Sequence, residues 1–208
     1  MVAACLLLLW PVTMQAETGG IEPRWDTGAT WDVAVHYRAL EKGAWSKPVM
    51  WRYTVVAVPG RGSDGYVIDV RPVHGGRGVT ARLSYREDYS LETVTMIREM
   101  GGGLRESSFS YDTGAPVLTS GSPFSFDTPV FPLVSPSTED YAARRRMADG
   151  LSYQVNISQS VVSEGNDGRV SVTCETSNGH SFRQEWLAGM PWPVEGENEA
   201  MKYELVKK

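Results

Sequence analysis

Residues 31–38, WDVAVHYR, carry the pattern that decides the fold. Every second residue from Trp31 to Tyr37 is apolar, whereas Asp32 and His36 fall on the other side of the chain. Because successive side chains of a strand point to opposite faces, this alternation predicts a strand with one buried and one solvent-facing side. Such half-buried strands are typical of antiparallel sheets, since the strands of parallel sheets are buried on both faces.

The same alternation recurs along the chain, and turn-forming residues separate its copies. Stretches rich in Gly, Asn and Asp, such as residues 59–65, 101–103 and 166–168, end one copy and precede the next. The spacing predicts roughly eight to ten strands in one antiparallel meander that forms a curved sheet, half-barrel or barrel. The further copies are residues 49–55, 66–70, 79–85, 151–157, 170–174 and 182–186.

Two consecutive segments depart from this pattern. Residues 122–136, SPFSFDTPVFPLVSP, combine four prolines with three phenylalanines, which predicts an extended crossover rather than a ladder strand. Ser137 then precedes two acidic residues and the run YAARRRMA, and Asp149-Gly150 follows. These are the start and stop signals of a helix, so we expect one short helix over about residues 137–149. The predicted class is therefore mainly β with a single helix.

The N-terminus indicates where the protein goes. An apolar run from Val2 to Val12 leads to Ala16, after which the chain becomes polar. The run is too short to span a bilayer and predicts a cleaved signal peptide over residues 1–16, a single β domain over 17–208, and a secreted or periplasmic location. A retained anchor and lipid anchoring at Cys5 are the alternatives, but the Leu-rich run follows Cys5 where a lipidation motif requires it to precede the cysteine.

Charge and cysteine content narrow the function further. The chain has 20 basic and 25 acidic residues, a balance that favours neither a nucleic-acid partner nor an anionic membrane surface. After residue 16 no apolar stretch is long enough for a transmembrane helix. Loss of Cys5 with the signal leaves Cys174 alone, in an alternating run that predicts a small buried side chain. We therefore expect no disulfide and a fold held by its apolar core.

The tetrapeptide Asp-Thr-Gly-Ala occurs twice, at residues 26–29 and 112–115. It resembles the active-site triplet of aspartic proteases, in which two carboxylates share one proton, and this resemblance implies catalytic roles for Asp26 and Asp112. The apolar strand residues that precede the aspartate in that family are absent here, and Asp followed by Gly before a strand is also typical turn chemistry. We predict two turns, with an aspartic-type hydrolase as a remote alternative.

Metal and cofactor sites are not indicated. His36, His74 and His180 lie far apart in the sequence and form no metal-binding motif. The glycine-rich stretches lack the Lys-Ser/Thr and the following helix of a phosphate-binding loop. We therefore expect no metal, no cofactor and no catalytic residues.

Aromatic residues supply the remaining candidates for a ligand site. Several lie on the apolar faces of predicted strands, three lie in the crossover, and one lies in the loop Met190-Pro191-Trp192-Pro193. They either fill the core and plug the barrel ends or line a concave sheet face on which the crossover closes as a lid. The candidate ligand-binding residues are Trp31, Trp51, Tyr53, Phe124, Phe126, Phe131 and Trp192.

A leader, a mature chain of about 190 residues, a long antiparallel meander and one helix after a crossover resemble the periplasmic lipoprotein carriers of bacteria. That resemblance implies an open or half β-barrel holding acyl chains on its concave face. We expect a non-catalytic binding module for an apolar ligand, such as a lipid or acyl chain, or for an envelope protein. A structural or assembly component of the envelope is the alternative.

Overall fold

The computed structural model describes residues 23–38, 43–74, 79–87, 89, 91–100, 103–111, 141–146, 152–164, 168–177, 179 and 181–206. These residues form twelve β-strands and no helix. The strands are β1 (Thr30–Tyr37), β2 (Val49–Ala57), β3 (Gly65–Pro72), β4 (Val79–Arg86), β5 (Leu91–Met100), β6 (Gly103–Tyr111), β7 (Tyr141–Arg146), β8 (Ser152–Glu164), β9 (Arg169–Thr176), β10 (Ser181–Leu187), β11 (Glu195–Asn198) and β12 (Met201–Val206).

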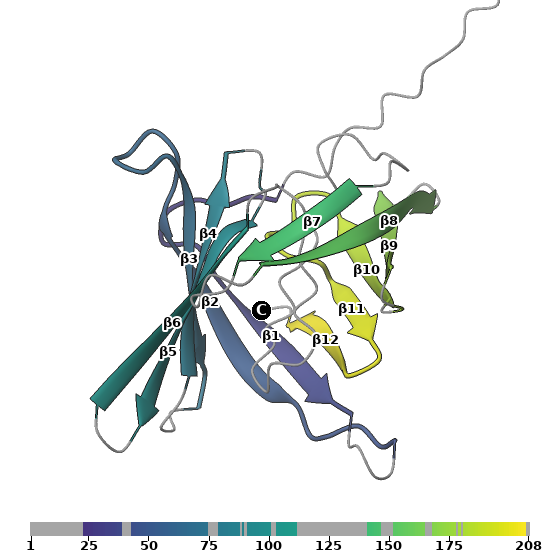
Figure 1. Ribbon diagram of the computed structural model, residues 1–208, viewed down its shortest axis with the longest axis horizontal. Helices are drawn as coiled ribbons and strands as arrows, with labels where there is room; N and C mark the ends of the chain where they lie inside the picture. Colours follow the sequence, from purple (N-terminus) through teal and green to yellow (C-terminus); the bar gives the residue numbers. More distant parts are fainter. Residues whose placement is uncertain are drawn as a thin grey trace, which may run out of the picture.

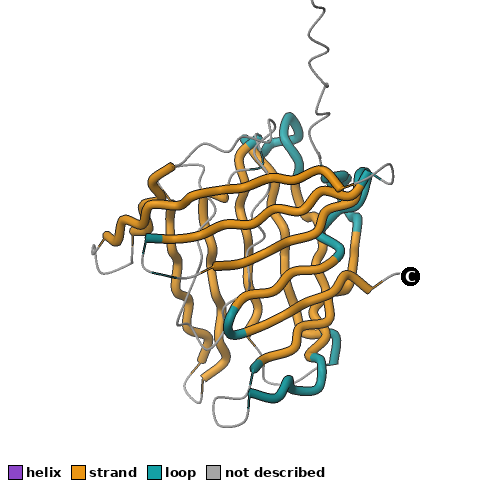
Figure 2. The backbone as a smooth tube through the Cα atoms, turned by 90° about the vertical axis from the view of Figure 1, so that its right-hand side faces the viewer, coloured by secondary structure: helices purple, strands orange, loops and turns teal. Residues whose placement is uncertain are grey.

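The strands form a closed antiparallel barrel in which each strand pairs with its neighbours in the sequence (Figure 1). Closure comes from β1, which pairs with β2 on one side and with β12, the last strand among the described residues, on the other. The shortest pairing joins β6 to β7, through only two residue pairs. Figure 2 shows the long strands wrapping around the barrel, with short loops at its ends. The predicted antiparallel meander is confirmed, and it closes into a barrel.

The apolar side of the alternating pattern faces the barrel interior. The first stretch to show it places Trp31, Val33 and Val35 in the core, while Asp32 and His36 lie on the outer face. Neighbouring strands add their own alternate residues, among them Val55, Ile68, Val70, Leu83, Val172 and Trp186. Burial of this continuous apolar interior is the main source of the barrel's stability.

The predicted helix over 137–149 is wrong where the structure describes it. Residues 141–146, YAARRR, form strand β7, which pairs with β8 through six residue pairs. Alanine and arginine favour helices, but the propensity differences between ordinary residues are below ~1 kcal/mol each and yield to the pairing of a whole strand. Pairing with β8 therefore outweighs the helix start and stop signals of the sequence, and residues 141–146 form a strand.

Cys174 forms no disulfide among the described residues and is fully buried, as its place in the alternating run predicts. Among the described residues no helix is long and apolar enough to cross a membrane. The expected signal peptide, residues 1–16, lies outside the described residues, as does the crossover over 122–136.

Candidate functional site

The candidate aromatic residues that the structure describes lie inside the barrel and contact one another. Trp31 of β1 stacks on Tyr53 of β2, with ring centroids 5.6 Å apart. Trp192 packs against both, at 5.5 Å from Trp31 and 4.6 Å from Tyr53. Trp51 also belongs to this core. Phe124, Phe126 and Phe131 lie outside the described residues.

Trp192 fills one end of the barrel rather than lining an open face. It is 1% exposed, and the loop that carries it is fixed by a hydrogen bond from Trp25 Nε1 to the carbonyl oxygen of Pro191 (2.8 Å). Trp25 in turn contacts Tyr66 and Tyr85 edge-on or tilted, at 5.1 and 4.9 Å. Residues 23–25 and 190–193 thus form an aromatic plug, a role that the sequence pattern had offered as the alternative to ligand binding.

The first Asp-Thr-Gly-Ala copy is a tight turn, as predicted. The amide of Ala29 donates to the carbonyl oxygen of Asp26 (2.9 Å), and Gly28 has a φ of 85°. A positive φ at the third turn position defines a type II turn and favours glycine there. Asp26 itself is exposed. Asp112, its proposed catalytic partner, lies outside the described residues.

A charged groove with a volume of about 550 Å³ lies on the outer face of the barrel. It extends over β9–β12 and β1, and the sequence analysis had not identified it. Because β10, β11 and β12 are adjacent strands, their outward residues meet across the sheet. The charged residues that line it are His36, Arg169, Arg183, Glu185, Glu195, Glu197, Lys202 and Glu204.

Strand register orders these charges into two rows. Arg183, Glu197 and Lys202 are directly opposite one another on β10, β11 and β12, and their signs alternate. In the next row Glu185 is opposite Glu195, and Glu195 is opposite Glu204. We call Glu185, Glu195 and Glu204 the carboxylate row. Three like charges on directly opposed positions oppose strand pairing, so this arrangement costs stability.

Glu185 differs from the other two members of the carboxylate row because it is buried, at 7% exposure. Its Oε1 accepts a hydrogen bond from Nε of Arg183 (2.7 Å), which also donates to Oγ of Ser171 (3.1 Å). Its Oε2 is buried and has no hydrogen-bond donor among the described residues. Glu195 and Glu204 are exposed.

The inner side of the same strands holds a buried polar pair. Nε2 of Gln184 donates to the hydroxyl of Tyr203 (2.7 Å). Tyr203 lies across Gly196, and a Cβ at Gly196 would overlap the tyrosine ring. Glycine is therefore required at this position of β11 by the close approach of the ring rather than by its backbone angles. The pair fixes the backbone that presents Glu195 and Glu197 to the groove.

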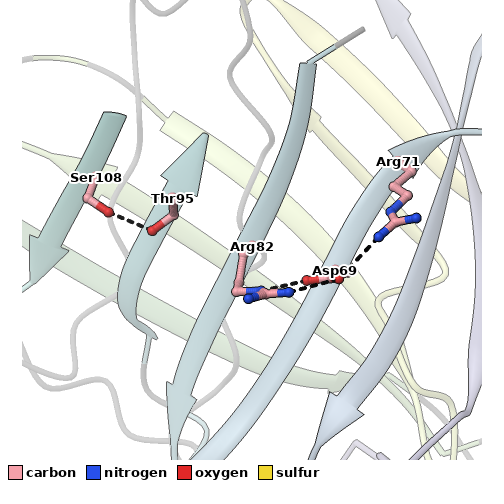
Figure 3. Close-up of polar contacts among 5 residues, drawn as sticks. All are labelled: Asp69, Arg71, Arg82, Thr95 and Ser108. Carbon is pink, nitrogen blue, oxygen red and sulfur yellow. Dashed lines mark hydrogen bonds and ion pairs between the residues drawn. The ribbon is translucent and has the colours of Figure 1, made fainter. Parts of the chain in front are cut away.

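On β3 and β4 the outer face carries a matched pair of opposite charges. Asp69 of β3 accepts from Arg82 of β4 through both carboxylate oxygens (2.7 and 3.1 Å), and Arg71 lies 3.6 Å from it (Figure 3). Thr95 and Ser108 continue this row by a hydrogen bond between β5 and β6. We call Thr54, Asp69, Arg82, Thr95 and Ser108 the paired row, because each member is directly opposite the next.

Hydrogen bonds within the matched pairs favour the charged state of each arginine. The hydrogen bond to Asp32 raises the pKa of Arg52, and the hydrogen bond to Asp69 raises the pKa of Arg82. Because the pKa of each arginine is raised, the stability that this shift contributes is present at physiological pH and is lost as the pH rises into strong alkali.

Comparisons with family models, with curated proteins and with solved structures find no match to this chain. The described residues include no group of three or more His, Cys, Asp or Glu side chains placed to hold a metal ion. Two features of the molecule bear on its function, namely the filled aromatic interior and the charged outer groove.

Proposed function

We propose that the protein is a non-catalytic binding module outside the cytoplasm, in which the barrel interior is scaffold and the outer groove is the binding surface. The groove has the volume of a small-molecule site and presents charged groups from five strands. The observation that carries the proposal is the carboxylate row, because two of its three members, Glu195 and Glu204, have no ion-pair partner among the described residues. The extracytoplasmic location is supported by the apolar run over residues 2–12.

An apolar ligand inside the barrel is less well supported. Trp31, Tyr53 and Trp192 are each 4% exposed or less and pack on one another, so an acyl chain would have to displace the aromatic plug. Displacing a buried aromatic side chain costs roughly as much as deleting one, about 3–5 kcal/mol. The outer groove needs no such rearrangement.

Two-dimensional NMR of the ¹⁵N-labelled chain separates these alternatives. The probes are a neutral monoacylglycerol and a panel of small charged compounds comprising an amine, a dicarboxylate and an amino acid. We expect a charged probe to shift the amide signals of β10–β12 and the monoacylglycerol to shift none.

Shifts of the indole signals of Trp31 and Trp192 with the monoacylglycerol would contradict the proposal and favour a carrier of apolar ligands. A silent response to every probe would also contradict it and favour a structural component of the envelope. Trp45 supplies an internal control, because its indole lies at the surface beside Arg38 and Lys202 rather than in the plug.

A further inference from the structure

Strand β6 is paired over most of its length on one side only. It pairs with β5 through eight residue pairs, whereas only Ser110 and Tyr111 pair with β7. Among the described residues, no strand pairs with residues 103–109 on the side that faces β7. Figure 1 shows β5 and β6 running away from β7 and β8 beyond the point where β6 meets β7. We call residues 103–109 the β6 edge.

The β6 edge is exposed on both of its faces. Successive residues of a strand point to opposite faces, yet each of residues 103–108 is exposed, and Leu104 is 76% exposed. On β5 the residue directly opposite Ser107 is Met96, which is only 5% exposed. The buried rows of the neighbouring strands therefore do not continue onto the β6 edge, and its backbone is accessible to a further strand.

The sequence of the β6 edge does little to prevent pairing with another chain. An exposed edge presents unpaired backbone N–H and C=O groups, and proteins normally protect it with proline, lysine or a bulge. Residues 103–109, GLRESSF, contain neither proline nor lysine, and their pairing with β5 has no register shift. The charged residues of this segment are Arg105 and Glu106, which have opposite signs. The β6 edge thus has no net charge that would repel a second strand.

Charge complementarity favours a second copy of the same edge as the partner. When two antiparallel copies of a strand extend one sheet about a two-fold axis, the residue at the axis lies directly opposite its own copy. An axis at Arg105 opposes two arginines and an axis at Glu106 opposes two glutamates, so both registers are disfavoured. An axis nearer to either end of the β6 edge leaves few residues to pair.

An axis at Ser107 avoids both repulsions. It places Ser107 opposite its copy, Glu106 opposite Ser108, and Arg105 opposite Phe109. No two like charges are directly opposed in this register. The residues that pair, 105–109, all lie within the β6 edge. The β6 edge is therefore complementary to itself in one register.

We propose that the β6 edge pairs with the β6 edge of a second copy of this chain, antiparallel and centred on Ser107. The sheet then continues from one barrel into the next, and main-chain hydrogen bonds supply the affinity. The same residues form the interface on both copies, so the assembly closes at two chains. This inference goes beyond the proposed function, because the outer groove lies over β9–β12 and β1 and takes no part in the pairing.

Sedimentation velocity of the purified protein over a range of concentrations tests the proposal. We expect a reversible equilibrium between monomer and dimer. Ser107→Lys and Ser107→Glu each place two like charges at the axis, and we expect each to raise the dimer dissociation constant about fivefold. A one-to-one mixture of the two variants opposes a lysine to a glutamate, so we expect a mixed dimer at least as stable as that of the parent chain.

Ser84→Lys is the matched control, because Ser84 is a half-buried serine of β4 that pairs with Val67 on one side and with Thr93 on the other. We expect it to leave the dimer dissociation constant unchanged. Circular dichroism shows whether each variant folds. Since Ser107 is exposed, neither substitution there buries a charge in the monomer, and either variant alone keeps the proposal testable.

A protein that stays monomeric at every concentration would overturn the proposal. Ser107 variants that dimerise as tightly as the parent chain would overturn it too, because the interface would then lie elsewhere. A mixture that dimerises no more tightly than its two components would exclude the register centred on Ser107. Assemblies larger than a dimer would contradict the two-fold axis and indicate that the β6 edge pairs with a different edge.

Discussion

The paired row across β2–β6 and the carboxylate row across β10–β12 lie on the same outer face of one barrel, but only the first matches opposite charges. Asp69 is opposite Arg82, whereas Glu195 is flanked by two further glutamates. Cross-strand pairs are worth up to about 1 kcal/mol each, favourable for opposite charges and unfavourable for like ones. The paired row therefore adds a little to the stability of the barrel, whereas the carboxylate row takes a little from it.

The largest loss of stability should follow from damage to the interior that supports both rows. Trp192→Ala removes the centre of the aromatic plug, and we expect a loss of about 3–5 kcal/mol in the free energy of unfolding, measured by urea denaturation. Trp45→Ala, a half-exposed tryptophan beside Arg38 and Lys202, is the control and should cost much less. Similar losses for both variants would show that Trp192 is not part of a packed core.

A smaller perturbation tests whether the carboxylate row depends on the inner face of its own strands. Gly196→Ala places a methyl group where the Tyr203 ring lies, and we expect a loss of about 1–3 kcal/mol from overpacking. The double variant with Tyr203→Ala should lose less than the sum of the two single changes, because the overlap is gone. Additive losses would contradict the contact.

Within the paired row, Asp69→Asn removes the carboxylate that binds Arg82 and leaves the arginine opposite a neutral side chain. Because Arg82 is about half exposed, with 55% of its side-chain surface accessible, solvent screens the pair. We expect a loss of no more than about 1 kcal/mol in the free energy of unfolding. The loss should shrink at high salt, and a stability gain would contradict the matched arrangement.

The smallest expected effect is a gain in stability rather than a loss, and it comes from the carboxylate row. Glu195→Gln removes both like-charge contacts of the row, with Glu185 and with Glu204, so without ligand it should raise the free energy of unfolding by a few tenths of a kcal/mol. Thermal denaturation at low and high salt checks this, since salt screens the repulsion and should abolish the gain. A loss of stability at low salt would mean that Glu195 is already neutralised within the fold.

Much of the fold was predictable because the interior is built from strict alternation. The runs that begin at Trp31, Val49 and Tyr66 became β1, β2 and β3 with their apolar sides inward, as expected. Strand β6 has no such run, because its sequence GLRESSFSY is mostly polar. Strand β11 contains Gly196, whose inward space is taken by Tyr203 of the next strand, so its own residues carry no signal of burial.

The groove was not predictable, because it depends on register rather than on composition. Glu185, Glu195 and Glu204 are nine or more residues apart in the sequence, and only the pairing of β10, β11 and β12 places them side by side. Trp31, Trp51 and Tyr53 were correctly placed on inward faces of strands, but the sequence did not distinguish a lined cavity from a filled one. That distinction depends on the loop position of Trp192, which is set by the hydrogen bond from Trp25 to Pro191.

The pairing of β1 with β12 has a consequence for the timing of folding. The first strand lacks one of its two neighbours until the last strand has been synthesised, so the ring cannot close on a growing chain. Until then β1 presents an open edge, and open edges favour association between chains. Closing the ring also brings together the two described strands that lie farthest apart in the sequence, and contacts of that kind carry the highest entropic cost of loop closure. A chain with this topology gains from being kept apart from its copies while it is being made.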